Sequence, residues 1–340
     1  MGNSSKLRVG IVGCGYQGGR LVEAMKLVDR LEFTACTDIN LQAAVELAGK
    51  VEKGKVYTSL DELLDRENVD IIMVATSHDA LAPVSLKAIQ AGKHVLVEKP
   101  CGMNDAEMEQ LEQAAVRTGI CYLAGYSFRY IPSWYRVYEL IQEGVVGEIQ
   151  AVMGKFTFSP MNEGWSSRPE TGGGPLLFIG SHLIDQVLWY MQDDPVEVFA
   201  SVLYRHDTQA DETSAFQVGF ARGATAQLMV TQAASSFSYQ LDITGRSGSI
   251  HLRVAGFLDY EILVTSTTVD TYKQPTVLHV PFEGDPRNVK HCRQLNEFVD
   301  AIQSGTRPFV TLQDGRRVLK VIDAVFASDR LGEPVNINLE

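Results

Sequence analysis

The feature that most constrains the fold of this chain is a glycine-rich turn close to its start. The apolar run Leu7–Val12 leads into Gly13-Cys14-Gly15-Tyr16-Gln17-Gly18, and the residues Gly18–Leu27 have the pattern of a helix. In such a turn the first glycine permits the tight bend, the second lets a pyrophosphate approach the backbone, and the third lets the helix pack closely on the strand. The start of the helix adds N–H groups that attract the same anion. We therefore predict a strand–turn–helix unit that binds a dinucleotide through Gly13, Gly15, Tyr16, Gln17 and Gly18.

Short apolar runs alternate with helical patterns through the first third of the chain. The run Asp70–Ala75 is almost entirely apolar, as a strand buried on both faces should be. The other predicted strands are Leu7–Val12, Glu32–Thr37, Val56–Tyr57, His94–Val97 and Ile120–Ala124. The helices predicted between them are Gly18–Leu27, Asn40–Ala48, Leu60–Leu64, Leu81–Ala91 and Asn104–Thr118. This alternation predicts an α/β fold, with a doubly wound parallel sheet of the Rossmann type in a dinucleotide-binding domain of residues 1–123.

The pattern changes in the remaining residues, 124–340. Helices are predicted at Ser133–Gln142 and Pro175–Met191, and two more follow near the end at Lys290–Ser304 and Gly315–Ser328. The predicted strands are Gln150–Phe158, Val196–Tyr204, Ser214–Phe220, Thr225–Val230, Tyr239–Thr244, Ser249–Val254, Tyr260–Thr265 and Val277–Val280. Turn-like residues at 221–224 and 245–248 fit hairpin loops. We predict a C-terminal α+β domain with a large, open, mostly antiparallel sheet.

An acidic residue, Asp38, follows the second predicted strand, 20 positions after the last glycine of the turn. A carboxylate at this place can accept hydrogen bonds from an adenosine ribose. It would repel a 2′-phosphate, and Ile39–Leu41 contains no arginine to neutralise one. NAD is therefore predicted in preference to NADP. Ala75 and Thr76, at the end of the buried strand, are predicted to border the same cofactor. The alternative is a glycine turn that serves sheet packing, beside a solvated aspartate.

The overall charge excludes some classes of partner. Lys and Arg number 30 against 42 Asp and Glu, a formal net charge of −12 at pH 7. Such a chain lacks the positive surface that binds nucleic acids or anionic membranes. No apolar run reaches the 18 residues of a membrane span, and Met1–Lys6 leads straight into a strand without a secretory signal. We expect a cytoplasmic protein with a small-molecule partner.

Cysteine and histidine spacing predicts no metal site. The five cysteines are odd in number and never spaced as CxxC, which favours reduced thiols. The seven histidines show no H-x-x-E-H or H-x-H spacing, and a G-x-S-x-G nucleophile turn is absent. Zinc enzymes and α/β-hydrolases are therefore disfavoured.

The predicted strand His94–Val97 leads into Glu98-Lys99-Pro100, which places Lys99 at the carboxyl end of a strand. Open α/β sheets hold ligands at the carboxyl ends of their strands. A lysine whose pKa is lowered by its surroundings can take a hydroxyl proton during oxidation and return it during reduction. The alternative is an ordinary surface lysine.

A second candidate group follows the triple glycine Gly172–Gly174. His182 and Asp185 lie three residues apart in an apolar helical pattern, so one helical face can present both. The alternative is a histidine at the edge of the core.

These motifs, taken together along the chain, resemble the Gfo/Idh/MocA oxidoreductases. The resemblance covers nearly the whole chain. It rests on the glycine turn, Ala91–Pro100, Gly125–Pro132, Glu143–Ile149, the triple-glycine segment up to His182, Gly305–Pro308 and Asp314-Gly315.

The resemblance implies a nicotinamide enzyme that oxidises a hydroxyl of a sugar, cyclitol or sugar derivative, or reduces the ketone. Lys99 matches the catalytic lysine of the family and His182 its catalytic histidine, and Glu98 and Lys99 are expected near the cofactor. The open sheet of the second domain forms the subunit interface in relatives. A homodimer or homotetramer is therefore expected.

One position departs from the family pattern. Relatives commonly carry an aspartate four residues before the histidine, where this chain has Phe178. Three explanations remain open: Lys99 and His182 suffice while the aromatic ring packs on an apolar sugar face, another carboxylate such as Asp185 or Glu170 substitutes, or the chemistry has changed.

Further substrate contacts are predicted around this site. Trp165 and Arg168 precede the triple glycine, and an arginine there can clamp an anionic or polyhydroxyl substrate. The alternative is an ordinary solvated loop. Arg129 follows the last strand of the first domain, with a structural ion pair as its alternative. Phe178 and Asp185 complete the predicted substrate set.

Two other functions remain open on the sequence. One is an NAD-dependent glycosidase that acts through transient oxidation. The other is a dinucleotide-binding sensor without catalysis, a reading that Phe178 favours and that Lys99 with His182 disfavours.

Overall fold

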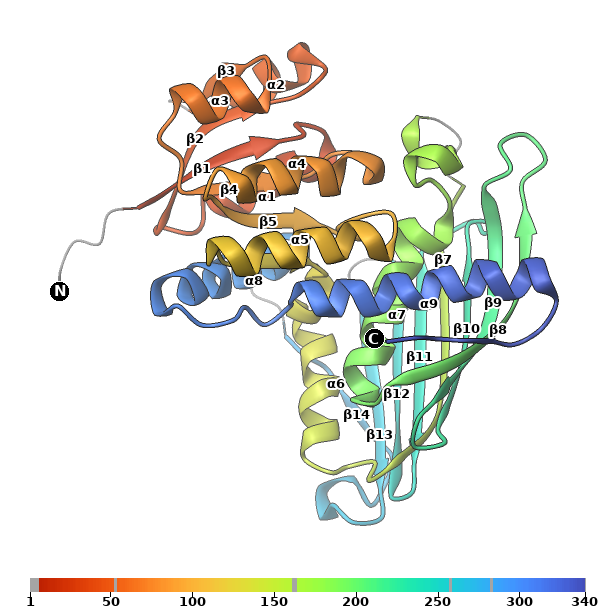
Figure 1. Cartoon of the computed structure of the whole chain (residues 1–340). Coiled ribbons are helices and arrows are strands. Elements are labelled where there is room, and N and C mark those ends of the chain that lie inside the picture. The colour runs from red at the N-terminus through yellow and green to blue at the C-terminus, as the bar shows by residue number, and fades with distance from the viewer. Residues whose placement is uncertain (1–5, 52–53, 161–163, 257–258, 282–283, 340) are drawn as a thin grey trace. The chain divides into compact units, whose positions relative to one another are not determined.

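The computed structural model describes residues 6–51, 54–160, 164–256, 259–281 and 284–339 (Figure 1). The sequence predicts no secretory signal in Met1–Lys6, but residues 1–5 lie outside the described part of the chain. The chain forms two compact units: Met1–Tyr130 with Arg287–Arg316, and Ile131–Pro286 with Arg317–Glu340. The sequence predicts a single domain boundary between residues 123 and 124. In the structure, residues Arg287–Arg316 also belong to the first unit.

The first unit contains a parallel sheet of six strands in the order β3-β2-β1-β4-β5-β6. The order reverses at β1, as in a doubly wound fold. Every residue of Ile71–Val74 has no solvent exposure, which explains its uninterrupted apolar sequence. The strands are β1 (Leu7–Val12), β2 (Leu31–Thr37), β3 (Lys55–Tyr57), β4 (Ile71–Val74), β5 (His94–Glu98) and β6 (Tyr122–Gly125).

Helices follow the strands as predicted, with ends set by local capping. Asn104 accepts a hydrogen bond from the Glu107 N–H at the start of α5, and Gly119 ends that helix with φ +68°. The helix predicted at Leu81–Ala91 begins three residues earlier, at His78. The helices of this unit are α1 (Tyr16–Met25), α2 (Leu41–Ala48), α3 (Leu60–Arg66), α4 (His78–Gln90), α5 (Asp105–Thr118) and α8 (Pro286–Ser304).

The main core of the first unit joins its sheet to a helix from the far end of the chain. Side chains of β1, β2 and β4 pack with α1, α2 and α8 in one cluster of buried residues. Leu295, Phe298 and Val299 of α8 are fully buried in this cluster. The return of the chain therefore completes the core beneath the glycine turn.

The second unit contains a nine-stranded sheet in the order β14-β13-β12-β11-β7-β10-β9-β8-β15. All neighbours run antiparallel except β7 and β10, which run parallel, so the prediction of a mostly antiparallel sheet is confirmed. The hairpins predicted at residues 221–224 and 245–248 are present. The strand predicted to begin at Ser214 begins at Asp211, and β15 was not predicted. The strands are β7 (Ile149–Thr157), β8 (Pro195–Tyr204), β9 (Asp211–Phe220), β10 (Thr225–Thr231), β11 (Ser238–Gly245), β12 (Gly248–Ala255), β13 (Asp259–Ser266), β14 (Thr276–Leu278) and β15 (Val335–Asn336).

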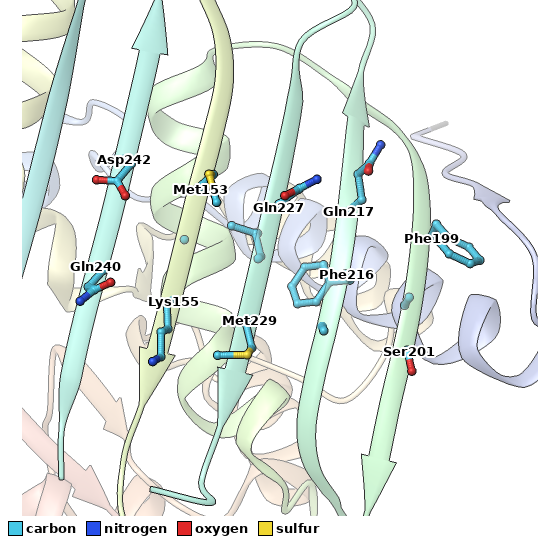
Figure 2. Close-up of a pocket in the computed structure, with 14 residues that line it drawn as sticks. Met153, Lys155, Phe199, Ser201, Phe216, Gln217, Gln227, Met229, Gln240 and Asp242 are labelled. Atoms are coloured by element: carbon cyan, nitrogen blue, oxygen red, sulfur yellow. The ribbon is translucent and has the colours of Figure 1, made fainter.

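Helices cover one face of this sheet. They are α6 (Pro132–Gln142), α7 (Ser181–Met191) and α9 (Leu312–Leu331), the last of which begins in the first unit. Every residue of α7 is buried. The opposite face of the sheet is open, and Figure 2 views it with the helices behind the strands. Met153, Phe199 and Leu203 are more than half exposed on that face.

Candidate active site

The glycine turn lies at the carboxyl end of β1, and two of its glycines leave no room for a side chain. Gly13 has φ +95°, and a Cβ there would lie 2.3 Å from the carbonyl oxygen of Ala75. A Cβ at Gly18 would lie 2.1 Å from the carbonyl oxygen of Gly13. At Gly15, by contrast, a Cβ would meet no atom within 4 Å. Glycine is therefore needed at 13 and 18 for internal packing, whereas the space beside Gly15 fits a ligand lying against the backbone.

The start of α1 adjoins this space. Gly15 is the N-cap residue, and within this described helix no side chain caps the first turn and no acidic residue lies in it. Tyr16 is 76% exposed. The N–H groups of this turn are thus available to an anion, and the turn fits the diphosphate of a dinucleotide.

Asp38 joins the end of β2 to the glycine turn. Its two carboxylate oxygens accept the N–H groups of Cys14 at 2.6 Å and of Asn40 at 2.7 Å. These bonds fix the carboxylate at the edge of the sheet beside the turn. Its predicted contact with a ribose stays a prediction.

Ala75 and Thr76 lie at the end of β4 on the same edge. The Ala75 N–H donates to the Val12 carbonyl oxygen at 2.8 Å, which ties the two strand ends together. His78 begins α4 and is buried.

Lys99 lies directly after β5 and is buried together with Glu98. The Lys99–Pro100 peptide bond is cis. Glu98 accepts a hydrogen bond at 2.7 Å from Gln17, a residue of the glycine turn.

The pKa values of Lys99 and Glu98 are both shifted. Burial, together with the charge of Lys290, lowers the pKa of Lys99 to about 8, while the charge of Glu98 opposes the shift. Burial raises the pKa of Glu98 above its usual range, and the Lys99 charge opposes that shift. An amine of this pKa exchanges a proton readily near neutral pH.

Helix α8 brings two further groups to this cluster. The Lys290 ammonium lies 5.1 Å from the centre of the Phe128 ring, and burial lowers the pKa of Lys290 to about 8. His291 lies 3.4 Å from the Gln17 amide, and burial lowers its pKa well below the usual range, so the ring is neutral. Neither residue was predicted from the sequence, because both lie far along the chain in an ordinary helical pattern.

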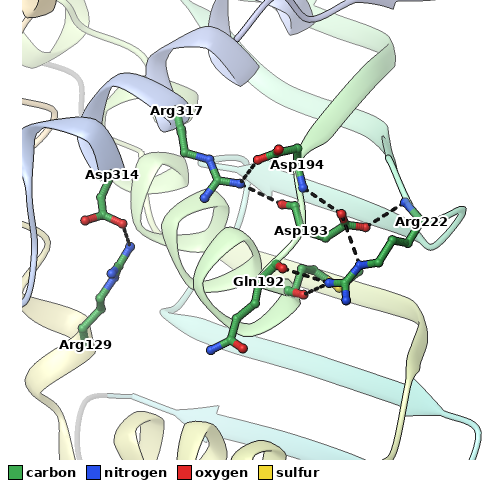
Figure 3. Close-up of polar contacts among 8 residues, drawn as sticks. Arg129, Gln192, Asp193, Asp194, Arg222, Asp314 and Arg317 are labelled. Atoms are coloured by element: carbon green, nitrogen blue, oxygen red, sulfur yellow. Dashed lines mark hydrogen bonds and ion pairs between the residues drawn. The ribbon is translucent and has the colours of Figure 1, made fainter.

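Arg129 is buried and forms an ion pair at 2.9 Å with Asp314 (Figure 3). Burial alone would raise the pKa of Asp314, but the Arg129 charge and two hydrogen bonds from Thr311 lower it. This is the structural alternative considered for Arg129. The substrate contact predicted for it stays a prediction.

In the second unit, His182 and Asp185 lie in the first turns of α7. Their exposed fractions are 4% and 0%, and the Gln186 amide lies 3.5 Å from an Asp185 oxygen. One turn of π-helix, Leu176–Gly180, precedes α7, so the helix predicted from Pro175 is not uniformly α. Such turns are frequent at functional sites.

Two aromatic rings meet beside this helix start. The ring centres of Trp165 and Phe178 lie 5.8 Å apart, and both side chains are half-buried. Arg168 and Glu170 of the same loop are exposed. The structure thus brings Trp165 to Phe178, which precedes His182 by about one helical turn.

The glycine turn and the strand ends around it define a Rossmann-type dinucleotide-binding protein. Two family models match the chain in agreement with this: an oxidoreductase family with an NAD-binding Rossmann fold over residues 7–126, and the GFO/IDH/MocA C-terminal domain over residues 134–251. The chain belongs to the Gfo/Idh/MocA family of oxidoreductases, whose first domain binds NAD(P).

Three curated relatives match over nearly their full lengths. The chain is 26% identical over 333 residues to a dTDP-3,4-didehydro-2,6-dideoxy-α-D-glucose 3-reductase of Actinomadura kijaniata, with 95% of this chain and 96% of the relative covered. It is 23% identical over 340 residues to a myo-inositol 2-dehydrogenase of Thermotoga maritima, with 98% and 99% covered. A trans-1,2-dihydrobenzene-1,2-diol dehydrogenase of Sus scrofa is 23% identical over 325 residues, with 94% and 96% covered. These relatives are dehydrogenases and a reductase.

Solved structures share the fold. GenD2 from gentamicin A biosynthesis, solved in complex with NAD, is 25% identical with a TM-score of 0.87, and 99% of this chain and 98% of that chain are covered. A levoglucosan dehydrogenase in complex with NADH and levoglucosan has a TM-score of 0.90 at 19% identity, with 99% and 100% covered.

Among the described residues, no helix is both long and apolar enough to span a membrane. In the same part of the chain, no three His, Cys, Asp or Glu side chains lie close enough together to hold a metal ion.

Proposed function

We propose that this protein is an NAD(H)-dependent oxidoreductase that interconverts a secondary alcohol and a ketone on a sugar, a cyclitol or a related ring. The observation that carries this proposal is Lys99, a buried lysine with a pKa of about 8 at the carboxyl end of β5. Ligands of such sheets lie at this edge, and the glycine turn lies on the same edge.

Lys99 serves as the general acid and base in this proposal. The hydride chemistry would be supplied by a bound nicotinamide, which would accept the hydride of the carbinol carbon or return it to the ketone. In oxidation the neutral Lys99 amine takes the hydroxyl proton, and in reduction the ammonium returns it, so protons and electrons balance in both directions. Glu98 and Lys290 set how readily Lys99 exchanges this proton, because Glu98 raises the pKa of Lys99 and Lys290 lowers it.

The second unit supplies the substrate contacts in this proposal. His182 positions the reacting oxygen, and the rings of Trp165 and Phe178 pack against an apolar face of the substrate ring. Arg168 is exposed beside them and can donate to hydroxyl groups. Names of the relatives support a ring substrate, since they include an inositol dehydrogenase and a dihydrobenzenediol dehydrogenase.

Asp38 supports NAD over NADP as the cofactor. Its carboxylate is fixed by the N–H groups of Cys14 and Asn40, so it cannot easily turn away from a 2′-phosphate. The expected result for Asp38→Ala is weaker NAD use with relatively better NADP use. Undiminished use of NAD by this variant would contradict the assignment.

A substrate panel tests the function. Inositols, polyols, aldoses and cyclic diols are incubated with NAD or NADP, and NADH or NADPH is followed by absorbance, with Lys99→Met as the negative control. Turnover of at least one ring alcohol by the wild type alone supports the proposal. Release of sugar from a glycoside without net NADH would indicate a glycosidase, and NADH binding without turnover of any compound would indicate a sensor.

We also propose that a second copy of the chain covers the open sheet face. A cavity of about 500 Å³ lies on this face between exposed apolar side chains and amides, including Met153, Phe199 and Gln227 (Figure 2). Lys155 and Asp242 supply opposite charges on the same face, which suits a self-complementary interface. Met153→Lys with Phe199→Glu should yield a monomer by light scattering, while Leu331→Lys, at the exposed end of α9, should not. A wild-type monomer would contradict this proposal.

A further inference from the structure

The residues predicted to meet substrate in the second unit lie on two segments joined by the triple glycine Gly172–Gly174. One segment is the Trp165 loop, residues 164–171, and the other is the π-turn and α7, which carry Phe178 and His182. Backbone bonds close the loop on the glycines: Gly173 N–H donates to the Arg168 carbonyl oxygen at 2.8 Å and Gly174 N–H to that of Ser166 at 3.1 Å. The Gly174 carbonyl oxygen then accepts the Phe178 N–H at 3.0 Å. Gly174 is thus the junction between the two segments.

A buried carboxylate from a distant strand holds this junction. Asp211, the first residue of β9, is 3% exposed, and its Oδ2 accepts the Leu176 N–H at 2.8 Å and the Ser214 hydroxyl at 3.3 Å. Its other oxygen lies against Gly174, where a Cβ would come within 1.9 Å of it. Gly174 has φ +113°, so this position needs glycine both for its backbone and for the close approach.

We propose that Asp211 is a positioning residue for the substrate end of the site. Its carboxylate fixes the turn between the Trp165 loop and the helix start, and thereby fixes Trp165, Phe178 and His182 relative to one another. The functional part of this inference rests on the proposed function, because it assumes that these three side chains meet substrate.

The charge of the carboxylate explains why an aspartate, and not an uncharged residue of the same size, holds this turn. An N–H bonds more strongly to an ionised carboxylate than to a neutral acceptor. A buried, ionised Asp211 that released the Leu176 N–H would lose its main donor, which is costly in the interior. The ionised residue therefore holds the turn more tightly than an uncharged residue of the same size.

The surroundings of Asp211 contain few charges. Burial raises the pKa of Asp211 to about 6, while the bonds from Leu176 and Ser214 oppose the shift. Across the β8–β9 pair it faces Tyr204, whose hydroxyl donates to Asp329 of α9 at 2.9 Å. Burial and these two carboxylates raise the pKa of Tyr204 to about 12, so Tyr204 stays neutral throughout the range in which Asp211 titrates. Glu212 is the next residue along the strand and is half-buried.

Hydrogen exchange followed by mass spectrometry tests the positioning role without any substrate. The full-length protein is compared with Asp211→Ala, Asp211→Asn and the control Asp193→Asn. Asp193 lies just beyond the opposite end of α7, where its carboxylate accepts the N–H groups of Asp194 at 2.9 Å and of Arg222 at 3.0 Å (Figure 3). Asp211→Ala should accelerate exchange in peptides covering 164–180 by about tenfold or more, the effect expected for a lost buried acceptor. Asp193→Asn should leave these peptides unchanged.

A pH comparison covers the case in which Asp211→Ala does not fold. After correction for intrinsic exchange, wild-type protection over 164–180 should fall between pH 7.5 and pH 5, as Asp211 takes up a proton. Asp211→Asn, which keeps the side-chain volume, should show no such change. Unchanged exchange in Asp211→Ala, or equal pH dependence in Asp211→Asn and wild type, would overturn the inference.

Kinetics on a substrate found in the panel then tests the functional part. Asp211→Ala should lower kcat/KM by about 10²-fold, the cost of misplaced substrate groups, with the Kd for NADH within twofold of wild type. Normal kcat/KM together with faster exchange would contradict the functional part. If no compound is turned over by wild type, the proposed function fails, and the exchange measurements still decide whether Asp211 holds the turn.

Discussion

The two halves of the proposed site are built in different ways. At the glycine turn, neighbouring strand ends hold one another: Asp38 bonds to the Cys14 N–H, Ala75 to Val12, and Gln17 to Glu98. At the start of α7, a carboxylate from β9 holds a turn 35 residues earlier in the chain. The first arrangement follows from a local motif and a parallel sheet, while the second includes a hydrogen bond between segments far apart in the chain. A change in the first half should therefore affect the cofactor or the chemistry directly, and a change in the second should affect the placement of substrate.

The largest effect is expected at Lys99. Lys99→Met keeps the length of the apolar stem but removes the group that carries the proton, so kcat should fall by roughly 10²–10⁴-fold. Binding of NADH, measured by fluorescence, should be retained. His182→Ala, in the other half, should raise KM more than it lowers kcat. Turnover of Lys99→Met near the wild-type level would mean that the acid–base group lies elsewhere.

The glycine turn allows ligand binding to be separated from folding. Gly15→Ala should weaken NADH binding by at least ~10-fold with an unchanged thermal midpoint, since its Cβ would enter only the space assigned to the ligand. Gly18→Ala should lower the midpoint as well, because its Cβ would meet the Gly13 carbonyl. Equal midpoints for the two variants would show that the packing distinction between these glycines is wrong.

The pH dependence of the reaction measures the pKa of Lys99 and the effects of the charges around it. For oxidation, kcat/KM should rise as the pH passes about 8, because Lys99 must lose its proton, and for reduction it should fall over the same range. Lys290→Met should move this step to higher pH, because Lys290 lowers the pKa of Lys99, and Glu98→Gln should move it to lower pH.

Lys290→Arg keeps the positive charge and serves as the control, with a step close to that of wild type. Shifts of the same sign in Lys290→Met and Glu98→Gln would contradict this electrostatic account of the first half.

The smallest effect is expected on stability in the second half. Global unfolding exposes Asp211 to water, whereas local opening of the turn leaves it buried. Because the folded-state pKa of Asp211 is raised to about 6, its contribution to the free energy of global unfolding is complete below the usual aspartate pKa and is lost as the pH rises through about 6. Asp211→Asn carries no charge to bury, so its thermal midpoint relative to wild type should rise by a few degrees between pH 4 and pH 7. A difference between the two that stays constant with pH would contradict the raised pKa.

The sequence was sufficient to locate those parts of the proposed site that local motifs determine. β1 was predicted with its observed ends, and Gly13, Asp38 and Lys99 all lie at the predicted strand ends, because parallel strands bring their carboxyl ends to one edge. Lys290, His291 and Asp211 were not found. Each reaches its place through tertiary packing of α8 or β9, and no spacing within the sequence signals such a contact.

The parallel pairing of β7 with β10 has a consequence for synthesis of the chain. β7 is synthesised first of the nine strands, yet it lies between β11 and β10 in the sheet. Its Ala151 can therefore pair only after Thr225 of β10 and Thr244 of β11 have been synthesised. At ribosomal rates of about 5–20 residues per second, the nearer partner appears roughly 4–15 s later. During that interval both edges of β7 are available to other strands, including those of a second nascent chain. We expect refolding of the second unit to be slow and dependent on protein concentration, since its central pairings close long loops.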